Sequence, residues 1–373
     1  MKAGWKTKPF EECTQKITYT PKVQRKDFLN DGTYPIISQE EHFINGYWNN
    51  EADIFKVTTP VIIFGDHTKV LKYIDFDFVL GADGVKVLQP KEFLVPKFFF
   101  YQLHATNLES LGYARHYKLL KELDIIFPPL PEQQRIVGIL DEAFEGIAVA
   151  KANAERNLQN ARTLFKSYLQ SVFAKNGKGW IVRTIGEVCT LRSGTTVGAA
   201  LEKSAGDLPY LKVADMAHAG NEIEIFSSSR FLDTTDIGKN AVLPSGATIF
   251  PKRGGSILTN KKRLTAVPIC ADLNIMGVIP GKNILPKFLY FYFLNVDMRQ
   301  IGSGSSIPQI NNYDIEPLAI SFPESVDQQA EIVCIFEKLS TETQHLESIY
   351  QQKLTALEEL KKSLLHQAFT GQL

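Results

Sequence analysis

The stretch that decides the fold runs from Pro131 to Phe173 and reads PEQQRIVGILDEAFEGIAVAKANAERNLQNARTLFKSYLQSVF. Apolar residues recur in it with three-and-four spacing and no proline follows the first position, which is typical of one long amphipathic helix. The apolar stripe consists of Ile136, Leu140, Phe144, Ile147, Ala154, Leu158, Ala161, Phe165, Tyr168 and Val172. Pro131 suits a first helical turn and Asn176-Gly177 supplies a stop, so we predict a helix roughly 60 to 65 Å long.

The same pattern returns at the end of the chain, between Asp327 and Phe369. Its apolar positions are Ile332, Phe336, Leu339, Leu346, Tyr350, Leu357, Leu360, Leu364 and Ala368. Ser325 with Gln328 forms a capping-box pattern before the helix, and Gly371 follows the last apolar residue. Two helices of this length are best explained by pairing with each other as an antiparallel coiled coil.

The segments that precede the two helices also match each other, in the same order, so the chain contains an internal repeat. The matches are Gly4-Trp5 with Gly179-Trp180, Pro35-Ile36-Ile37 with Pro209-Tyr210-Leu211, Ile63-Phe64 with Ile249-Phe250, Ala82-Asp83 with Ala271-Asp272, the aromatic runs after Pro96 and Pro286, Phe127-Pro128 with Phe322-Pro323, and Glu132-Gln133-Gln134 with Asp327-Gln328-Gln329. The offset between the copies grows along the chain. The halves therefore share a fold while their loops differ in length, and loops are where partner-specific variation usually lies.

Residues 1–130 and 177–326 consist of β-branched and aromatic runs broken by Gly, Pro and Asn, which predicts two mixed α/β globules. The helices occupy residues 131–176 and 327–373. The predicted fold class is α+β: two mixed α/β domains separated by two long helices that form an antiparallel coiled coil, with a pseudo-twofold internal repeat.

The composition excludes several protein classes. With 373 residues, of which 44% are hydrophobic and 22% charged, the chain is too long for one ordinary domain and too well mixed for a disordered protein. Its apolar stretches are too short to span a membrane, and the basic residues at the N-terminus are not followed by the apolar core of a signal peptide. We therefore expect a cytoplasmic protein with no membrane partner. The four cysteines lie far apart, so we expect no metal site.

The charges are balanced overall but clustered in one place. The chain has 41 Lys and Arg against 41 Asp and Glu. No acidic residue occurs between Asp236 and Asp272, whereas Lys239, Lys252, Arg253, Lys261, Lys262 and Arg263 do. The turn Gly254-Gly255-Ser256 lies within this run, and a glycine-rich turn flanked by cations allows close approach to DNA phosphates. In the first half, His67, Lys69 and Lys72 lie at the corresponding place.

A second loop precedes each Phe-Pro turn, from Gly112 to Lys118 in the first half and from Gly302 to Asn312 in the second. Arg, Gln and Asn are the residue types that pair with guanine or adenine edges, although they are also common in solvated loops. The predicted DNA-binding residues are Lys69, Lys72, Arg115, His116, Lys118, Lys252, Arg253, Lys261, Lys262, Arg263, Gln309 and Asn311.

An antiparallel pairing of the helices would relate the two globules by a pseudo-twofold axis, so that one chain imitates a symmetric dimer. Dimers of this kind bind two DNA half-sites separated by whole helical turns of about 34 Å. The alternative is a coiled-coil scaffold that carries two appended domains and has no role on DNA.

The sequence lacks the common catalytic motifs, so we expect a chain that is not itself an enzyme. It has no GxxxxGK[ST], HExxH or GxSxG pattern. Phe127-Pro128-Pro129-Leu130 lacks the polar and aromatic residues of the DNA amino-methyltransferase motif, and Glu359-Leu360-Lys361 lies on the predicted coiled coil rather than beside other carboxylates. We therefore assign no catalytic residue.

The stretch Phe127-Pro128-Pro129-Leu130-Pro131-Glu132-Gln133-Gln134-Arg135-Ile136-Val137 resembles the central conserved region of the specificity (S) subunit of type I restriction-modification enzymes. The ending from Leu364 to Leu373 is similar to the close of that family's second conserved helix. The start of the second helix departs from the pattern, because the stretch from Ser325 to Val333 has an extra residue and no matching Arg.

The resemblance implies that the two globules are target recognition domains, and that the helices act as a spacer and as a docking surface for two methyltransferase (M) subunits. Two restriction (R) subunits would complete the nuclease. S-adenosylmethionine, ATP and Mg²⁺ would belong to those partners rather than to this chain. The resemblance further implies a bipartite, asymmetric site on double-stranded DNA, with base flipping left to the methyltransferase.

Overall fold

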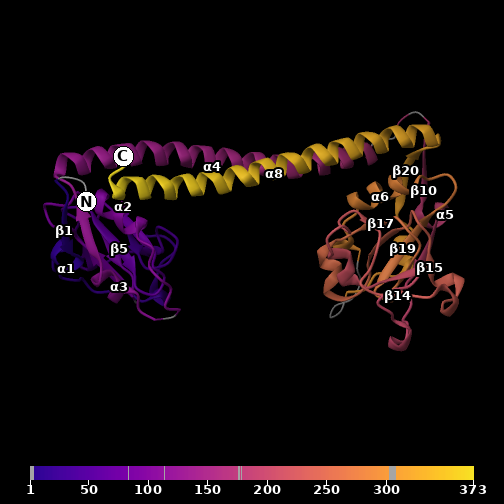
Figure 1. Cartoon of the computed structure of the whole chain (residues 1–373), viewed down its shortest axis with the longest axis horizontal. Coiled ribbons are helices and arrows are strands. Elements are labelled where there is room, and N and C mark those ends of the chain that lie inside the picture. Colours follow the sequence, from indigo (N-terminus) through magenta and orange to yellow (C-terminus); the bar gives the residue numbers. More distant parts are fainter. Residues whose placement is uncertain (1–3, 83, 113, 175–176, 178, 302–307) are drawn as a thin grey trace. The chain divides into compact units, whose positions relative to one another are not determined.

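The computed structural model describes residues 4–82, 84–112, 114–174, 177, 179–301 and 308–373. The chain divides into two compact units, of which the first comprises Met1–Glu155 with Gln351–Leu373 and the second comprises Arg156–Tyr350. The long helices α4 (Leu130–Phe173) and α8 (Val326–Thr370) each contribute a segment to both units (Figure 1). Each unit is described by itself below.

The globular part of the first unit is built from short strands and three short helices. In chain order these are β1 (Lys6–Pro9), α1 (Phe10–Cys13), β2 (Tyr34–Ile37), β3 (Gly46–Trp48), β4 (Ile54–Phe55), β5 (Val61–Gly65), β6 (Leu71–Ile74), β7 (Phe78–Leu80), β8 (Val85–Leu88), α2 (Pro96–Ala105), α3 (Tyr117–Lys121) and β9 (Asp124–Phe127).

The globular part of the second unit follows the same plan with two further strands. Its elements are β10 (Trp180–Thr184), α5 (Ile185–Val188), β11 (Cys189–Ser193), β12 (Leu208–Leu211), β13 (Glu224–Ile225), β14 (Phe231–Leu232), β15 (Val242–Leu243), β16 (Thr248–Pro251), β17 (Arg263–Thr265), β18 (Ile269–Ala271), β19 (Ile275–Pro280), α6 (Pro286–Asn295), α7 (Asn312–Ile315) and β20 (Ala319–Pro323).

Every strand pairing within the sheets of the first unit has a counterpart in the second, which confirms the predicted repeat. The sheet β3-β2-β7-β4 of the first unit has the same order as β14-β12-β18-β15 of the second, and in both sheets the central pair is parallel. The sheet β6-β5-β8 corresponds to β17-β16-β19, and the pair β1-β9 to β10-β20. The second unit adds β11 and β13 at the two edges of its larger sheet.

The aromatic runs after Pro96 and Pro286 form the helices α2 and α6, which pack between the sheets and the long helices. In the first unit, Phe98 lies edge-on against Phe369 of α8, with ring centroids 5.2 Å apart. In the second unit, the ring centroids of Phe291 and of Phe336 in α8 are 5.0 Å apart. Each proline begins its helix because its fixed backbone angle suits the first turn.

The long helices pair antiparallel in each unit, as predicted, because residue numbers rise along α4 while they fall along α8. In the first unit, Lys151 forms an ion pair with Glu358 at 3.2 Å, and the Arg135 guanidinium donates to the backbone oxygen of Leu373 at 2.9 Å. In the second unit, Arg162 pairs with Glu347 at 3.1 Å. The apolar stripes face the seam or the globules.

The ends of the helices follow the sequence signals closely. Ser325 caps α8 by accepting the Gln328 N–H, and Gly371 ends it with a φ of 76°. Helix α4 begins one residue before Pro131 and ends at Phe173, while the predicted stop residue Asn176 lies outside the described residues. Among the predicted seam residues, Leu360 is an exception, since 47% of its surface is exposed.

One fully buried glutamine near the start of each long helix joins that helix to its globule. Its side-chain oxygen accepts a backbone N–H from the residue just before the aromatic helix, and its amide donates to two backbone carbonyls. The bonds, of 2.8 to 2.9 Å, join Gln133 to Val95, Phe93 and Pro128, and Gln329 to Leu285, Asn283 and Pro323. Gln133 therefore corresponds to Gln329 rather than to Gln328, which locates the extra residue of the second helix start before this position.

Within the described part of the chain, no helix is both long and apolar enough to cross a membrane.

Candidate nucleic-acid interface

The basic segment of the second unit begins where β16 ends and continues into a 3-10 turn, Gly254–Thr259. Gly254 has a φ of 65°, a left-handed conformation that glycine adopts without strain. Among the described residues, none lies within 4 Å of a Cβ atom placed on Gly254 or on Gly255, so these residues leave the outer face of the turn uncovered. This geometry leaves room for a phosphate to approach the backbone.

The structure brings together the two loops that the sequence predicts as DNA contacts in the second unit. Arg253 and Gln309 face each other across an isolated antiparallel bridge, although more than fifty positions separate them in the sequence. The Gly254 N–H donates to the Pro308 oxygen at 2.8 Å. Arg253, an exposed cation, and Gln309, a half-buried amide, are thus fixed beside each other.

Asn311 contributes mainly to the local structure of this loop. It precedes α7, its backbone N–H donates to Asp314, and its side-chain amide donates to the Tyr313 hydroxyl at 2.8 Å. Its side-chain oxygen accepts an N–H of the Gln309 amide at 2.6 Å, which orients Gln309. Residues 302–307 of the predicted loop, and Tyr113 of its counterpart in the first unit, lie outside the described residues.

Two of the predicted contact residues in the second unit are buried lysines. Lys262 is only 2% exposed and its ammonium donates to the Asn260 side-chain oxygen and to the Val296 backbone oxygen, both at 2.6 Å. Lys252 donates to the Ser193 hydroxyl at 2.7 Å. Burial lowers the pKa of both amines, that of Lys262 to about 8. Both side chains hold the segment in place rather than face solvent.

Lys261 and Arg263 lie on a different surface from Arg253, because they line a cleft of about 1210 Å³ between the globule and the helices of the second unit. The carboxylates of Glu222, Glu224 and Glu337 lie on the same walls, as does the ion pair between Arg162 and Glu347. The cleft is therefore mixed in charge, unlike a groove that would follow a phosphate backbone. The basic run that is continuous in sequence is divided between two surfaces.

In the first unit, Lys72 is buried and anchors a loop. Its ammonium donates to the His42 and Phe43 backbone oxygens and to the Asn45 side chain, and burial lowers its pKa to about 8. Lys72 lies opposite Ile63 in the strand pair β5-β6, as Arg263 lies opposite Ile249 in the pair β16-β17.

Arg263 performs the same task in the second unit, where its guanidinium donates to the Asn221 backbone oxygen. The two cations therefore occupy equivalent strand positions, and each holds the loop that follows the first strand of the neighbouring sheet. Burial lowers the pKa of Arg263 as well.

His116 is also buried, with 1% of its surface exposed. Its Nε2 accepts the Leu111 N–H at 3.0 Å, so the ring proton lies on Nδ1, which is 3.0 Å from the Asp66 backbone oxygen. Both ring nitrogens are thus occupied within the fold. The ring closes the loop that carries Arg115, whose own side chain is exposed.

Lys69 and Lys118 remain at or near the surface of the first unit. Lys69 adopts a left-handed φ of 62° in the turn after β5, and its ammonium reaches the Leu108 backbone oxygen at 3.2 Å. Lys118 is exposed on α3. With Arg115, they are the predicted contact residues of this unit that keep access to solvent.

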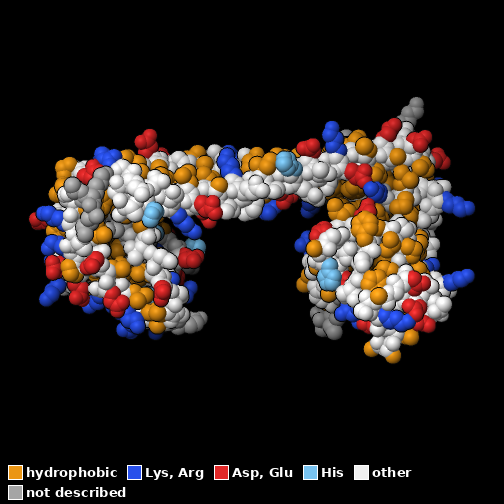
Figure 2. All heavy atoms as spheres, in the orientation of Figure 1, with side chains coloured by type: hydrophobic (Ala, Val, Ile, Leu, Met, Phe, Trp, Pro, Cys, Tyr) orange, Lys and Arg blue, Asp and Glu red, His pale blue; other side chains and the backbone are white. Residues whose placement is uncertain are grey.

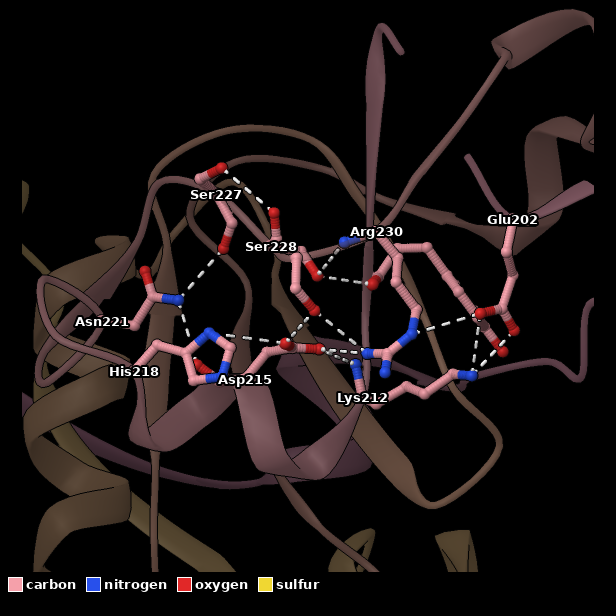
Figure 3. A network of polar contacts seen from close by, with 10 residues as sticks. Glu202, Lys212, Asp215, His218, Asn221, Ser227, Ser228 and Arg230 are labelled. Carbon is pink, nitrogen blue, oxygen red and sulfur yellow. Dashed lines mark hydrogen bonds and ion pairs between the residues drawn. The ribbon is translucent and has the colours of Figure 1, made fainter. Parts of the chain in front are cut away.

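Sequence reasoning did not identify a polar network that braces the longest inserted loop of the second unit, residues 212–230 (Figure 3). The buried carboxylate of Asp215 accepts the Lys212 N–H at 2.8 Å and the Ser229 hydroxyl at 2.9 Å, and Arg230 lies 3.6 Å away. Glu202 joins Lys212 and Arg230 from the other side, at 2.7 and 3.2 Å.

This loop supplies β13, which adds to the sheet beside β17. Its counterpart in the first unit, residues 38–45, is much shorter. The longer spacing between β12 and β14 is the sequence signal that could have revealed the insertion, but it gives no information on which side chains meet inside it.

The surface charge of each globule is mixed. The visible face of each carries Lys and Arg side chains interspersed with Asp and Glu (Figure 2). Among the described residues, no three His, Cys, Asp or Glu side chains gather closely enough to hold a metal ion.

Comparison with known proteins identifies the same architecture elsewhere. The family model described as "Type I restriction modification DNA specificity domain" matches the chain twice, at residues 3–156 and 177–356. The specificity subunit of the type I restriction enzyme EcoR124I/EcoR124II from Escherichia coli is 26% identical over 354 residues, which cover 86% of this chain and 83% of that protein. The EcoKI specificity subunit from Escherichia coli (strain K12) is 23% identical and covers 99% of this chain and 89% of that protein.

Two solved structures share the fold. A chain from a structure of a type I restriction-modification system superposes with a TM-score of 0.73 at 17% identity, covering 100% of this chain and 99% of that one. The HsdS subunit from Thermoanaerobacter tengcongensis superposes with a TM-score of 0.57, also at 17% identity, covering 100% of this chain and 98% of that one.

Proposed function

Since the chain belongs to the family of type I restriction-modification DNA specificity proteins, we propose that it selects the DNA site at which a methylating and restricting complex acts. Each unit would bind one half of a bipartite site on double-stranded DNA. Because the two units carry different side chains on equivalent loops, the two half-sites would differ in sequence, and the whole site would be asymmetric.

The observation that carries this proposal is the pairing of Arg253 with Gln309 beside a glycine turn that the described part of the chain leaves uncovered. A cation next to a backbone that a phosphate can approach suits positioning on the duplex, and an amide side chain next to them suits contact with a base edge. In the first unit, Arg115, Lys69 and Lys118 suit the same two roles, which are positioning on the phosphates and contact with a base edge. We leave Lys72, His116 and Lys262 out of the proposed contact surface because their polar atoms are engaged inside the fold.

The chemistry would be carried out by partner subunits. We propose that the long helices dock two methyltransferase subunits, and that two restriction subunits join them. S-adenosylmethionine, ATP and Mg²⁺ would be bound by those partners, and adenine would be methylated after it is flipped out of the duplex. This chain would contribute DNA binding and no reacting group.

The experiment that tests the proposal is a genome-wide map of methyladenine in cells with and without the gene. The expected result is the loss of one split motif, methylated on both strands, when the gene is deleted, and its return when the gene is restored. Expression of the methyltransferase must be verified in the same cells. An unchanged map in cells that make the methyltransferase would refute the proposal.

A second measurement separates DNA recognition from a pure scaffold role. The complex with Arg115→Glu and Arg253→Glu should bind duplex DNA more weakly than the unmodified complex, because both exposed side chains would turn from attraction to repulsion of phosphates. Co-purification of the methyltransferase should be unaffected. Unchanged DNA affinity with intact assembly would favour a scaffold with no DNA role.

A further inference from the structure

The loops that carry Arg115 and Gln309 are attached to the two units in the same way. In the first unit, Asp66 follows β5 and its backbone oxygen accepts the His116 N–H at 2.7 Å. In the second unit, Lys252 follows β16 and its backbone oxygen accepts the Ile310 N–H at 2.9 Å. Strands β5 and β16 occupy the same central place in their sheets.

These bonds make His116 and Ile310 equivalent, and both are buried, at 1% and 0% exposure. The residue immediately before each is therefore also equivalent: Arg115 in the first unit and Gln309 in the second. The sequence repeat did not reveal this match, because the two loops differ in length and have different residues at the positions that this match makes equivalent. The hydrogen bonds alone define it.

The backbone around each of these residues is held from both sides. Before Arg115, the Ala114 N–H donates to the Leu111 oxygen at 3.3 Å, and the His116 ring accepts the Leu111 N–H. Arg115 thus projects from a closed loop. A side chain on a backbone that is already ordered loses less conformational entropy when it binds.

Gln309 is held in a comparable way. On one side, the Gly254 N–H donates to the Pro308 oxygen, and on the other the Ile310 N–H donates to Lys252. The Gln309 amide donates one N–H to the Asn311 side-chain oxygen. A contact with adenine requires the other N–H of this amide and its oxygen. The existing bond therefore orients the amide, and the described residues leave these groups for a ligand.

We infer that this shared position is where each unit contacts a base edge, with Arg115 reading a guanine in one half-site and Gln309 reading an adenine in the other. The inference rests on the proposed function. Arginine pairs with the O6 and N7 of guanine through two parallel N–H donors, and glutamine pairs with the N6 and N7 of adenine through one donor and one acceptor. Their different chemistry at an equivalent position would make the two half-sites differ at matching bases.

The test exchanges the two side chains. Arg115→Gln and Gln309→Arg are each introduced into the gene, and methyladenine is mapped in cells that make the whole complex. Arg115→Gln should change one required guanine to adenine in one half-site, and Gln309→Arg should change one required adenine to guanine in the other. Lys26→Gln, an exposed change in the first unit that lies outside the proposed contact loops, is the control and should leave the motif unchanged.

A second measurement covers variants that no longer methylate. The purified variant complex selects duplexes from a random pool, and the preference for the new base over the old one at the affected position should be about 10-fold. Unchanged bases at every position in both variants would overturn the inference, as would a position that relaxes without a new preference. Those results would leave the proposed function intact, since the unmodified chain would still direct a split motif. Absence of any motif that depends on the gene would instead refute the proposed function itself.

Discussion

The junction between helix and globule is the same in both units, whereas the loops at the other ends of the strands differ in length, sequence and internal bonding. Gln133 and Gln329 each make three hydrogen bonds, and the backbone atoms that accept or donate them correspond between the two units. The loop of residues 212–230, by contrast, is braced by a buried carboxylate, while its counterpart of residues 38–45 is held mainly by Lys72. The shared part fixes each globule to the long helices, and the variable part supplies the surface on which the two units can differ.

The largest effect is expected at the shared junction. Gln133 and Gln329 are fully buried, and replacing either by Ala would remove the side-chain partner of one backbone N–H and two backbone carbonyls, so each substitution should lower the free energy of unfolding by about 3 kcal/mol. The adjacent exposed residues provide matched controls: Gln134→Ala and Gln328→Ala should change it by less than about 0.5 kcal/mol. Urea denaturation measures this, and Trp180 reports on the second unit. Equal effects for the buried and exposed members of a pair would contradict the anchoring role of the buried glutamine, and a large effect at only one of Gln133 and Gln329 would contradict the equivalence of the two junctions.

A smaller loss of stability is expected where a cation anchors the variable loop. Lys72→Met removes donors from two backbone oxygens and from Asn45, and should cost about 2 kcal/mol. Arg263→Met should cost about 1 kcal/mol, because Arg263 holds its loop through fewer bonds to it and the second loop has its own network around Asp215.

Lys118→Met, on an exposed side chain, serves as the control for both substitutions in the same denaturation experiment. If Arg263→Met proved as costly as Lys72→Met, the internal network of the second loop would not be an independent support.

Lys262 should give the stability of the second unit a dependence on pH. Burial lowers its pKa to about 8 in the folded chain, whereas an unfolded lysine titrates near its ordinary value of 10.5. Between these values the unfolded chain binds more protons, so stability should rise with pH across this window. The neutral amine keeps two hydrogens for Asn260 and Val296, so the site survives deprotonation.

The expected gain is on the order of 1 kcal/mol from pH 8 to pH 10, relative to Lys262→Met measured under the same conditions. Comparison of the two proteins cancels the other groups that titrate in this range. If the free energy of unfolding changed equally with pH in the two proteins, Lys262 would stay charged in the folded chain.

Periodicity made the long helices, their antiparallel pairing and the repeat predictable, because apolar spacing and turn residues act locally along the chain. The site was less predictable. Lys72, His116 and Lys262 look like surface cations or loop residues in sequence, but their burial depends on carbonyl groups supplied by distant segments. The equivalence of Arg115 and Gln309 depends on one backbone bond in each unit, and no residue type encodes such a bond.

The smallest effect is expected from the exposed cation beside the glycine turn. Arg253→Gln removes one charge without disturbing a buried group, so if Arg253 contacts a phosphate, affinity for all duplex sequences should fall similarly. The slope of log affinity against log salt concentration should flatten by about one unit, because one fewer counterion is released on binding. Lys338→Gln, an exposed change on α8, removes the same charge away from the turn and should leave the slope unchanged. A fall confined to the preferred sequence, with no change in slope, would assign Arg253 to base contact instead, and would place both members of the Arg253–Gln309 bridge on the bases of one half-site.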